Sequence, residues 1–259
     1  MISKISPNNC NTPNFGHNSR TDMNKKQKTV VMASAVAGMT PVLMVLAKKK
    51  GFSLNPQKIF RTNIKDWALF KYSPSDKAID FGNPINIIAT AMGSVAGGYA
   101  GGAIIDNKNV KAKKREVLNQ ILGNVLVPIT TVYLGSLAYG KYQNRLEAAM
   151  PQIKSLDKSA KVLNNVLKKL PQAGATLAAL GAGIFLGNKV SNYINEKVYH
   201  KKIDRNIRAT DFAPHVDDLC MATTMMDPRS TFGQKLGRII PLALIVPGYQ
   251  TGIAQEDKA

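Results

Sequence analysis

The feature that most constrains this fold is a pair of uncharged segments in which small residues recur at every fourth position. The two rows are Ala89, Gly93, Gly97 and Gly101 in the first segment, and Ala175, Ala179, Gly183 and Gly187 in the second. In water, interior glycine destabilises a helix by about 1 kcal/mol per residue relative to alanine. In a bilayer the helix persists because the backbone must satisfy its own hydrogen bonds, and a row of small residues lets another helix approach closely. The pattern predicts helices packed in a membrane, with these helix-packing residues: Gly93, Gly97, Gly101, Ala179, Gly183 and Gly187.

Five stretches of the chain lack Asp, Glu, Lys and Arg and are long enough to be considered as membrane-spanning helices. They are 29–47, 81–105, 117–140, 170–188 and 239–255. A membrane-spanning helix needs about 20 apolar residues, with a lower limit near 17. The second and third stretches are comfortable spans, the first is adequate, and the last two are marginal. A short apolar helix can also be a core helix of a soluble protein. We predict an all-α fold in the form of a helical membrane bundle.

The two glycine segments also introduce a predicted internal repeat. Each is followed by a basic segment and then by an apolar helix containing proline. The aligned pairs are Gln120/Gln234, Leu122/Leu236 and Gly123/Gly237. This predicts a lead helix plus two repeated hairpins, although Ala/Gly-rich helices also resemble one another through composition alone. The predicted regions are a disordered polar tail (1–28), the lead helix with a basic, aromatic segment (29–80), hairpin repeat 1 (81–140), a basic amphipathic linker helix (141–169), and hairpin repeat 2 (170–255) with a polar loop (189–238).

The charge balance bears on partners and location. Lys and Arg number 35 against 16 Asp and Glu, giving a formal net charge of +19. Such an excess favours nucleic acid or an anionic membrane surface. No nucleic-acid recognition motif accompanies it, so we expect anionic membrane lipid as the partner and no nucleic acid. A second copy of the chain or another membrane protein is a further candidate. The two cysteines, Cys10 and Cys220, form no disulfide framework and indicate a reducing compartment.

Two connecting segments have the composition of a membrane interface. In 56–72, aromatic residues including Trp67 and Phe70 alternate with lysine and arginine, as in interfacial anchors. In 155–170, an apolar stripe of leucines lies opposite lysines that include Lys158 and Lys161, which suits a helix lying flat on headgroups or on a neighbouring helix. We predict Trp67, Lys158 and Lys161 as interfacial residues.

The orientation in the membrane is weakly encoded. If all five stretches span, one side holds the tail and the segments 106–116 and 189–238, with 19 Lys and Arg. The other side holds 48–80, 141–169 and the last residues of the chain, with 16. Orientation is normally set by a strong imbalance. We expect a multi-pass protein of the bacterial cytoplasmic membrane with its N-terminal tail in the cytosol.

One dense group of metal-ligand types occurs in the chain, at 211–220. Asp211, His215 and Asp218 would share one helical face, and His with carboxylate suits a divalent transition metal. Helix capping by Asp217 and Asp218, with ion pairing by Asp211, explains the same residues without an ion. We therefore predict no metal, no cofactor and no catalytic residue. Polar uncharged residues inside the apolar stretches could line a path or bond between helices: Asn86, Thr90, Asn119, Gln120, Asn124, Thr130, Thr131 and Gln250.

Three runs of residues carry a resemblance to known sequences: Asn14-Phe15-Gly16, the segment 187–197, and the segment 211–220. With them, roughly 80–259 resembles uncharacterised bacterial membrane proteins. The resemblance implies a bacterial, membrane-embedded protein and transfers no catalytic residue. We predict a non-enzymatic integral membrane protein of structural or interaction type. The alternative is a small transporter or channel built from two repeats, which convergent polar groups inside the bundle would favour.

Overall fold

A computed structural model describes residues 23–61, 69–70, 82–154, 157–201, 207–226 and 231–256, and over these residues the chain is helical with no strand. The all-α prediction is confirmed. The elements are α1 (Lys25–Lys49), α2 (Pro56–Arg61), α3 (Gly82–Ile105), η2 (Asn107–Asn109), α4 (Val110–Leu118), η3 (Asn119–Leu126), α5 (Val127–Ala148), α6 (Lys158–Lys197), η4 (Ala209–His215), α7 (Val216–Met226), α8 (Thr231–Ala243) and α9 (Ile245–Ile253).

Four helical stretches within the described residues are long and apolar enough to cross a membrane. They are Lys25–Lys49, Pro84–Ile105, Asn107–Ala148 and Ser159–Lys197. By length and composition they indicate a multi-pass membrane protein. The fifth predicted stretch, 239–255, is not one continuous helix, because a break at Leu244 separates α8 from α9.

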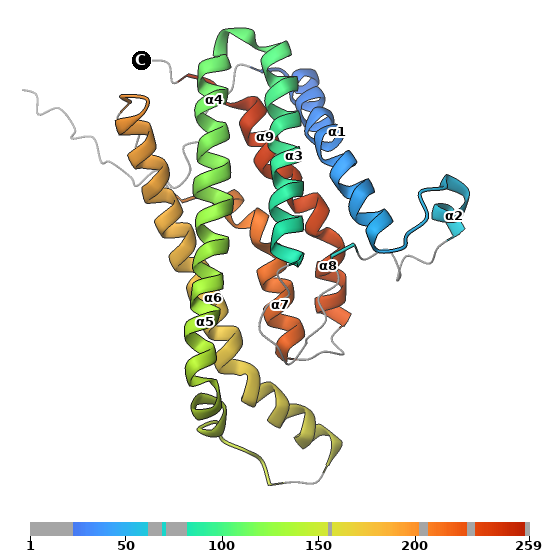
Figure 1. Ribbon diagram of the computed structural model, residues 1–259, viewed down its shortest axis with the longest axis vertical. Coiled ribbons are helices and arrows are strands. Elements are labelled where there is room, and N and C mark those ends of the chain that lie inside the picture. The colour runs from blue at the N-terminus through green and yellow to red at the C-terminus, as the bar shows by residue number, and fades with distance from the viewer. Residues whose placement is uncertain are drawn as a thin grey trace, which may run out of the picture.

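Helices α1, α3 and α9 lie side by side, with their backbones in contact at glycines (Figure 1). On one face of α3, a side chain at Gly93 or Gly97 would meet the backbone of Gly38 in α1, and one at Gly101 would meet Ser34. On another face, Gly98 and Gly102 meet the backbones of Gly248 and Gly252 in α9. The order of these contacts makes α1 antiparallel and α9 parallel to α3. We call this three-helix contact the glycine seam.

The other glycine row packs elsewhere. Helix α5 runs along α6, and the two extend past the rest of the bundle at one end (Figure 1). Ala179 of α6 faces Gly135, Gly183 faces Pro128, and Gly187 faces the backbone of Gly123. The two rows therefore have different partners. They do not pack against each other.

Helix α6 contains both the predicted amphipathic linker segment and the second glycine row. It continues through Pro171 as one helix, so a separate linker helix ending near residue 169 is wrong. Proline in a helix interior removes a hydrogen bond and bends the helix, and the yellow start of α6 runs at an angle to its orange remainder in Figure 1. Leu163 and Leu170 of the predicted stripe are exposed. Their contact with lipid stays a prediction.

The packing does not reproduce two equivalent hairpins. Helix α3 lies against α1 and α9, whereas α5 lies against α6. The residues aligned in the predicted repeat also differ in surroundings, since Gly123 faces Gly187 and Gly237 faces the carbonyl of Phe70. The duplication remains a prediction. Phe70 itself is buried in an apolar cluster with Leu46 and Leu244, so its assignment to an interfacial anchor is wrong.

The predicted topology placed the last residues on the side opposite the tail, and the structure corrects this. The backbone carbonyl of Ala254 accepts a hydrogen bond from Lys113 at 2.8 Å, and Gln255 donates to Asp106 at 3.1 Å. Residues 254–256 therefore lie at the same end of the bundle as 106–116 and the start of α1. The reason is that the predicted polar loop 189–238 contains η4, α7 and the start of α8, which enter the bundle instead of covering its surface.

Candidate functional site

Buried polar side chains gather around η3. Asn119, Gln120 and Asn124 are each less than one-tenth exposed, within a stretch that has no charged residue from 117 to 140. Their partners come from three other elements: Asn195 of α6, Gln250 of α9 and Asp211 of η4. A buried polar group in a low-dielectric interior is costly unless it is hydrogen-bonded. We call this connected set, with Glu116 and His215, the polar seam.

The local backbone of η3 is unusual. The segment is a π-helix, in which the N–H of Val127 donates to the carbonyl of Leu122 five residues earlier. Single π-turns inside α-helices are frequent at functional sites. Pro128 follows at once, and because proline has no N–H, the carbonyl of Asn124 has no α-helical donor. No N–H at the α-helical position therefore competes for this carbonyl.

A continuous chain of hydrogen bonds runs inward from the charged end of α4. The amide of Gln120 donates to Glu116 at 2.6 Å and to Gln250 at 2.5 Å. The amide of Asn124 donates to the side-chain carbonyl of Gln120 at 3.0 Å and to Asp211 at 2.9 Å. Asn124 is the eighth residue of the uncharged stretch 117–140, or about 11 Å along a helix at 1.5 Å per residue.

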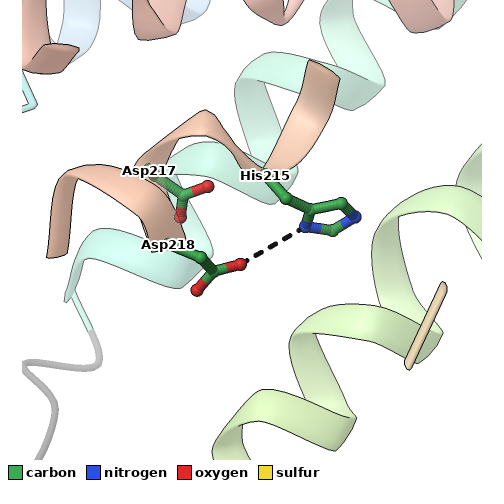
Figure 2. A group of neighbouring side chains, drawn as sticks. All are labelled: His215, Asp217 and Asp218. Carbon is green, nitrogen blue, oxygen red and sulfur yellow. Dashed lines mark ion pairs between the residues drawn. The ribbon is translucent and has the colours of Figure 1, made fainter. Parts of the chain in front are cut away.

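The available carbonyl of Asn124 pairs with His215. The His215 Nε2 atom lies 2.7 Å from it, and the ring is almost fully buried. Because a carbonyl oxygen only accepts, Nε2 must carry the hydrogen of this bond. The opposite ring nitrogen, Nδ1, lies 3.5 Å from the carboxylate of Asp218 (Figure 2).

Two adjacent carboxylates face this ring from the first turn of α7. Figure 2 shows Asp217 and Asp218 beside His215, and potential ligand atoms of the three residues lie within 4.8 Å of one another. Nδ1 of His215, one oxygen of Asp217 and Oδ2 of Asp218 are buried and have no hydrogen-bond partner. Asp211, by contrast, turns away to Asn124 and to the backbone N–H of Arg208.

The structure therefore changes one residue of the metal-ligand group considered from the sequence, which consists of Asp211, His215 and Asp218. The grouping of Asp211 with His215 and Asp218 requires one continuous helix over 211–218. The chain instead forms a 3₁₀ segment up to His215 and begins α7 at Val216, which changes the angular position of Asp211. Asp217 takes its place. The expected position of Asp217 and Asp218 in the first turn of a helix is confirmed.

A second polar cluster lies at the end of the bundle near residues 254–256. Lys113 is fully buried and forms an ion pair with Asp106 at 3.0 Å. Burial alone would raise the pKa of Asp106, but hydrogen bonds from Gln255, Asn109 and Lys113 outweigh it and hold the pKa below its ordinary value. Burial likewise opposes ionisation of Glu256, whereas Lys201 and Arg115 lower its pKa. The cluster joins α4 to the segment after α9.

The predicted interfacial residues are only partly described. Lys158 is the first residue of α6 and Lys161 is exposed on the same helix. Two neighbouring lysines, Lys168 and Lys169, reach Glu147 of α5 at 3.7 and 3.0 Å. Trp67 lies outside the described residues. The interfacial role of all three residues stays a prediction.

Comparison with known protein families, curated proteins and solved structures finds no match to this chain. The resemblance to uncharacterised bacterial membrane proteins gains no support from it. The functional argument therefore rests on the geometry of the polar seam.

Proposed function

We propose that this chain is a small, non-enzymatic membrane transporter or channel that carries a small cation through the polar seam. The observation that supports the proposal is the hydrogen-bonded chain from Glu116 through Gln120 and Asn124 to the ring of His215. Ionisable groups inside a membrane bundle are costly, and they commonly mark ion or proton pathways. Because of this hydrogen-bonded chain, we favour the alternative prediction of a transporter or channel over the prediction of a structural or interaction protein.

The elements around the seam support the same proposal. Transporter sites typically form where helices are interrupted, because the unwound backbone supplies polar groups. Here the π-turn of η3, the 3₁₀ segment η4 and the break at Leu244 occur in neighbouring elements. The available carbonyl of Asn124 is one such backbone group.

The setting of the proposal is the bacterial cytoplasmic membrane, with anionic lipid around the bundle and the N-terminal tail in the cytosol. Each candidate span exposes large apolar side chains that suit lipid contact. Examples are Val45 in α1, Ile104 in α3, Leu134 in α5 and Phe185 in α6. Lysines at both ends of the helices suit anionic headgroups. Nucleic acid has no role in this proposal.

Membrane integration is tested first, by washing cell membranes with alkaline carbonate. The chain should remain in the pellet, since four of its helices are long and apolar enough to cross the bilayer. Release into the supernatant would exclude any transport role.

Transport is tested with the full chain in liposomes that contain anionic lipid. Proton entry is read with a trapped pH-sensitive dye, and Mn²⁺ entry with a trapped fluorescent chelator. We expect at least one flux well above that of empty liposomes, and a fall of about tenfold or more in His215→Ala. The matched control is His200→Ala, which removes an exposed histidine outside the seam. Fluxes equal to those of empty liposomes would reject the proposal.

A structural or interaction role is the second candidate. Its support is the glycine seam, where α1, α3 and α9 make backbone contacts suited to a rigid scaffold. The partner would be a second copy of the chain or another membrane protein. A closed, flux-free protein that co-purifies as a stable assembly would favour this function.

A further inference from the structure

Contrary to the prediction from the sequence, which expects no metal here, we infer that His215, Asp217 and Asp218 bind one divalent transition-metal cation, because capping leaves one buried atom of each residue without a hydrogen-bond partner. This names the ion for the transport function proposed above and in that sense rests on it. Binding itself is measured without transport, so the two can fail separately.

The first argument is the tautomer of His215. Its Nε2 carries a hydrogen because it faces the carbonyl of Asn124 at 2.7 Å. In the neutral ring, Nδ1 then has a lone pair and no hydrogen. That lone pair faces an oxygen of Asp218 at 3.5 Å, so two acceptors confront each other in a buried place. A bound cation resolves this conflict by accepting both lone pairs.

The second argument is the spacing of the three residues. Metal–nitrogen and metal–oxygen bonds of about 2.0–2.2 Å place two ligand atoms of a tetrahedral site about 3.4 Å apart. The separation between His215 and Asp218 is 3.5 Å, and the whole group of ligand atoms lies within 4.8 Å. Asp217 supplies the third ligand atom of this group. Imidazole with two carboxylates suits Zn²⁺ or Mn²⁺.

The third argument is the support around the ring. Metal-binding histidines commonly donate their other N–H to a carboxylate or a backbone carbonyl, which fixes the ring orientation. The carbonyl of Asn124 has this role here, and Pro128 keeps it available by lacking an N–H. His215 is 2% exposed, so its position is fixed by packing as well.

The experiment uses the full chain, purified in detergent, stripped with EDTA and dialysed. Zn²⁺ and Mn²⁺ are then added separately, and bound metal is measured by elemental analysis and titration calorimetry. We expect one equivalent of at least one metal in the parent. Bound metal should fall to background in His215→Ala and in Asp218→Asn, and remain at one equivalent in His200→Ala.

Further variants keep the inference testable if His215→Ala fails to fold. Asp217→Asn conserves shape and should weaken binding, because it removes one charged ligand. Pro128→Ala supplies a competing N–H to Asn124 and should weaken binding about 10–100-fold, as loss of an outer partner does. Substoichiometric metal in the parent, or equal metal in the parent and in Asp217→Asn and Asp218→Asn, would overturn the inference. Metal uptake without flux would instead reject transport and leave the site standing.

Discussion

The glycine seam and the polar seam hold neighbouring helices together by opposite means. In the glycine seam, α3 meets α1 and α9 with almost no side chain between them, as at Gly98 against Gly248. In the polar seam, η3 meets α6, α9 and η4 through long amide and carboxylate side chains, such as Gln120 and Asp211. Dispersion between close backbones needs one geometry, whereas side-chain hydrogen bonds can exchange partners. One contact therefore depends on the positions of the helix backbones, and the other on the partners of polar side chains.

The largest expected effect is a break of the glycine seam. Gly98→Leu and Gly97→Leu should each lower the stability of the purified protein by about 1–3 kcal/mol, as overpacking does. The reason is that a Cβ atom at either site meets backbone, which cannot rotate away. Gly98 lies outside the row of Gly93, Gly97 and Gly101, but it forms a second row with Gly102 that faces α9. Thermal unfolding in detergent is the measurement.

Gly181→Leu is the matched control for this prediction. Gly181 lies in α6, where an added Cβ atom would meet nothing within 4 Å. Its midpoint should stay close to that of the parent. If Gly97→Leu, Gly98→Leu and Gly181→Leu unfold at the same temperature, close backbone packing does not stabilise the seam.

A smaller effect is expected from the polar seam. Asn124→Leu removes the donor to Gln120 and to Asp211 and leaves both acceptors without it. Unsatisfied buried acceptors cost about 1–3 kcal/mol in soluble proteins, but hydrogen bonds in membrane bundles average nearer 0.6 kcal/mol. We expect a loss of about 1 kcal/mol in thermal unfolding. A loss as large as that of Gly98→Leu would show that the polar seam is as rigid as the glycine seam.

The smallest effect is expected at the charged cluster outside both seams. The pKa of Glu256 is held below its ordinary value of 4.5, so its contribution to stability is present above that pH and is lost as the pH falls below it. Glu256 and its partner Lys201 are both partly exposed, so Glu256→Gln should lower the stability at pH 7 by only about 1 kcal/mol or less. The difference should shrink at pH 3. A constant difference across this range would exclude the carboxylate charge as the cause.

The sequence predicts the helical class well because both signals for it are local. Uncharged stretches of sufficient length and rows of small residues at every fourth position are recognised within a single segment. They require no knowledge of the helix that packs against it. The partner of each row cannot be read in this way, since Gly97 and Gly183 look alike but face α1 and α5. Periodicity tells which face is flat and not which helix covers it.

The candidate site was predictable in its residue types and not in its grouping. Gln120, Asn124 and Gln250 stand out as polar residues in apolar stretches, but Gln250 lies 130 residues from Gln120 in the chain. The replacement of Asp211 by Asp217 depends on where a 3₁₀ segment gives way to α7. No period in the sequence marks that point. The charged residues of 189–238 also led to the prediction of a polar loop, whereas η4, α7 and the start of α8 pack in the bundle.

The position of Lys113 has a consequence for how the chain is synthesised. Its ammonium group bonds to Asp106, seven residues earlier, and to the carbonyl of Ala254, which is 141 residues later. At about 5–20 residues per second, the ribosome adds Ala254 roughly 7–28 s after Lys113. During this interval the second partner of the Lys113 ammonium group has not yet been translated. Closure of this end of the bundle is therefore a late event of folding, which follows the translation of α1, α3 and α6.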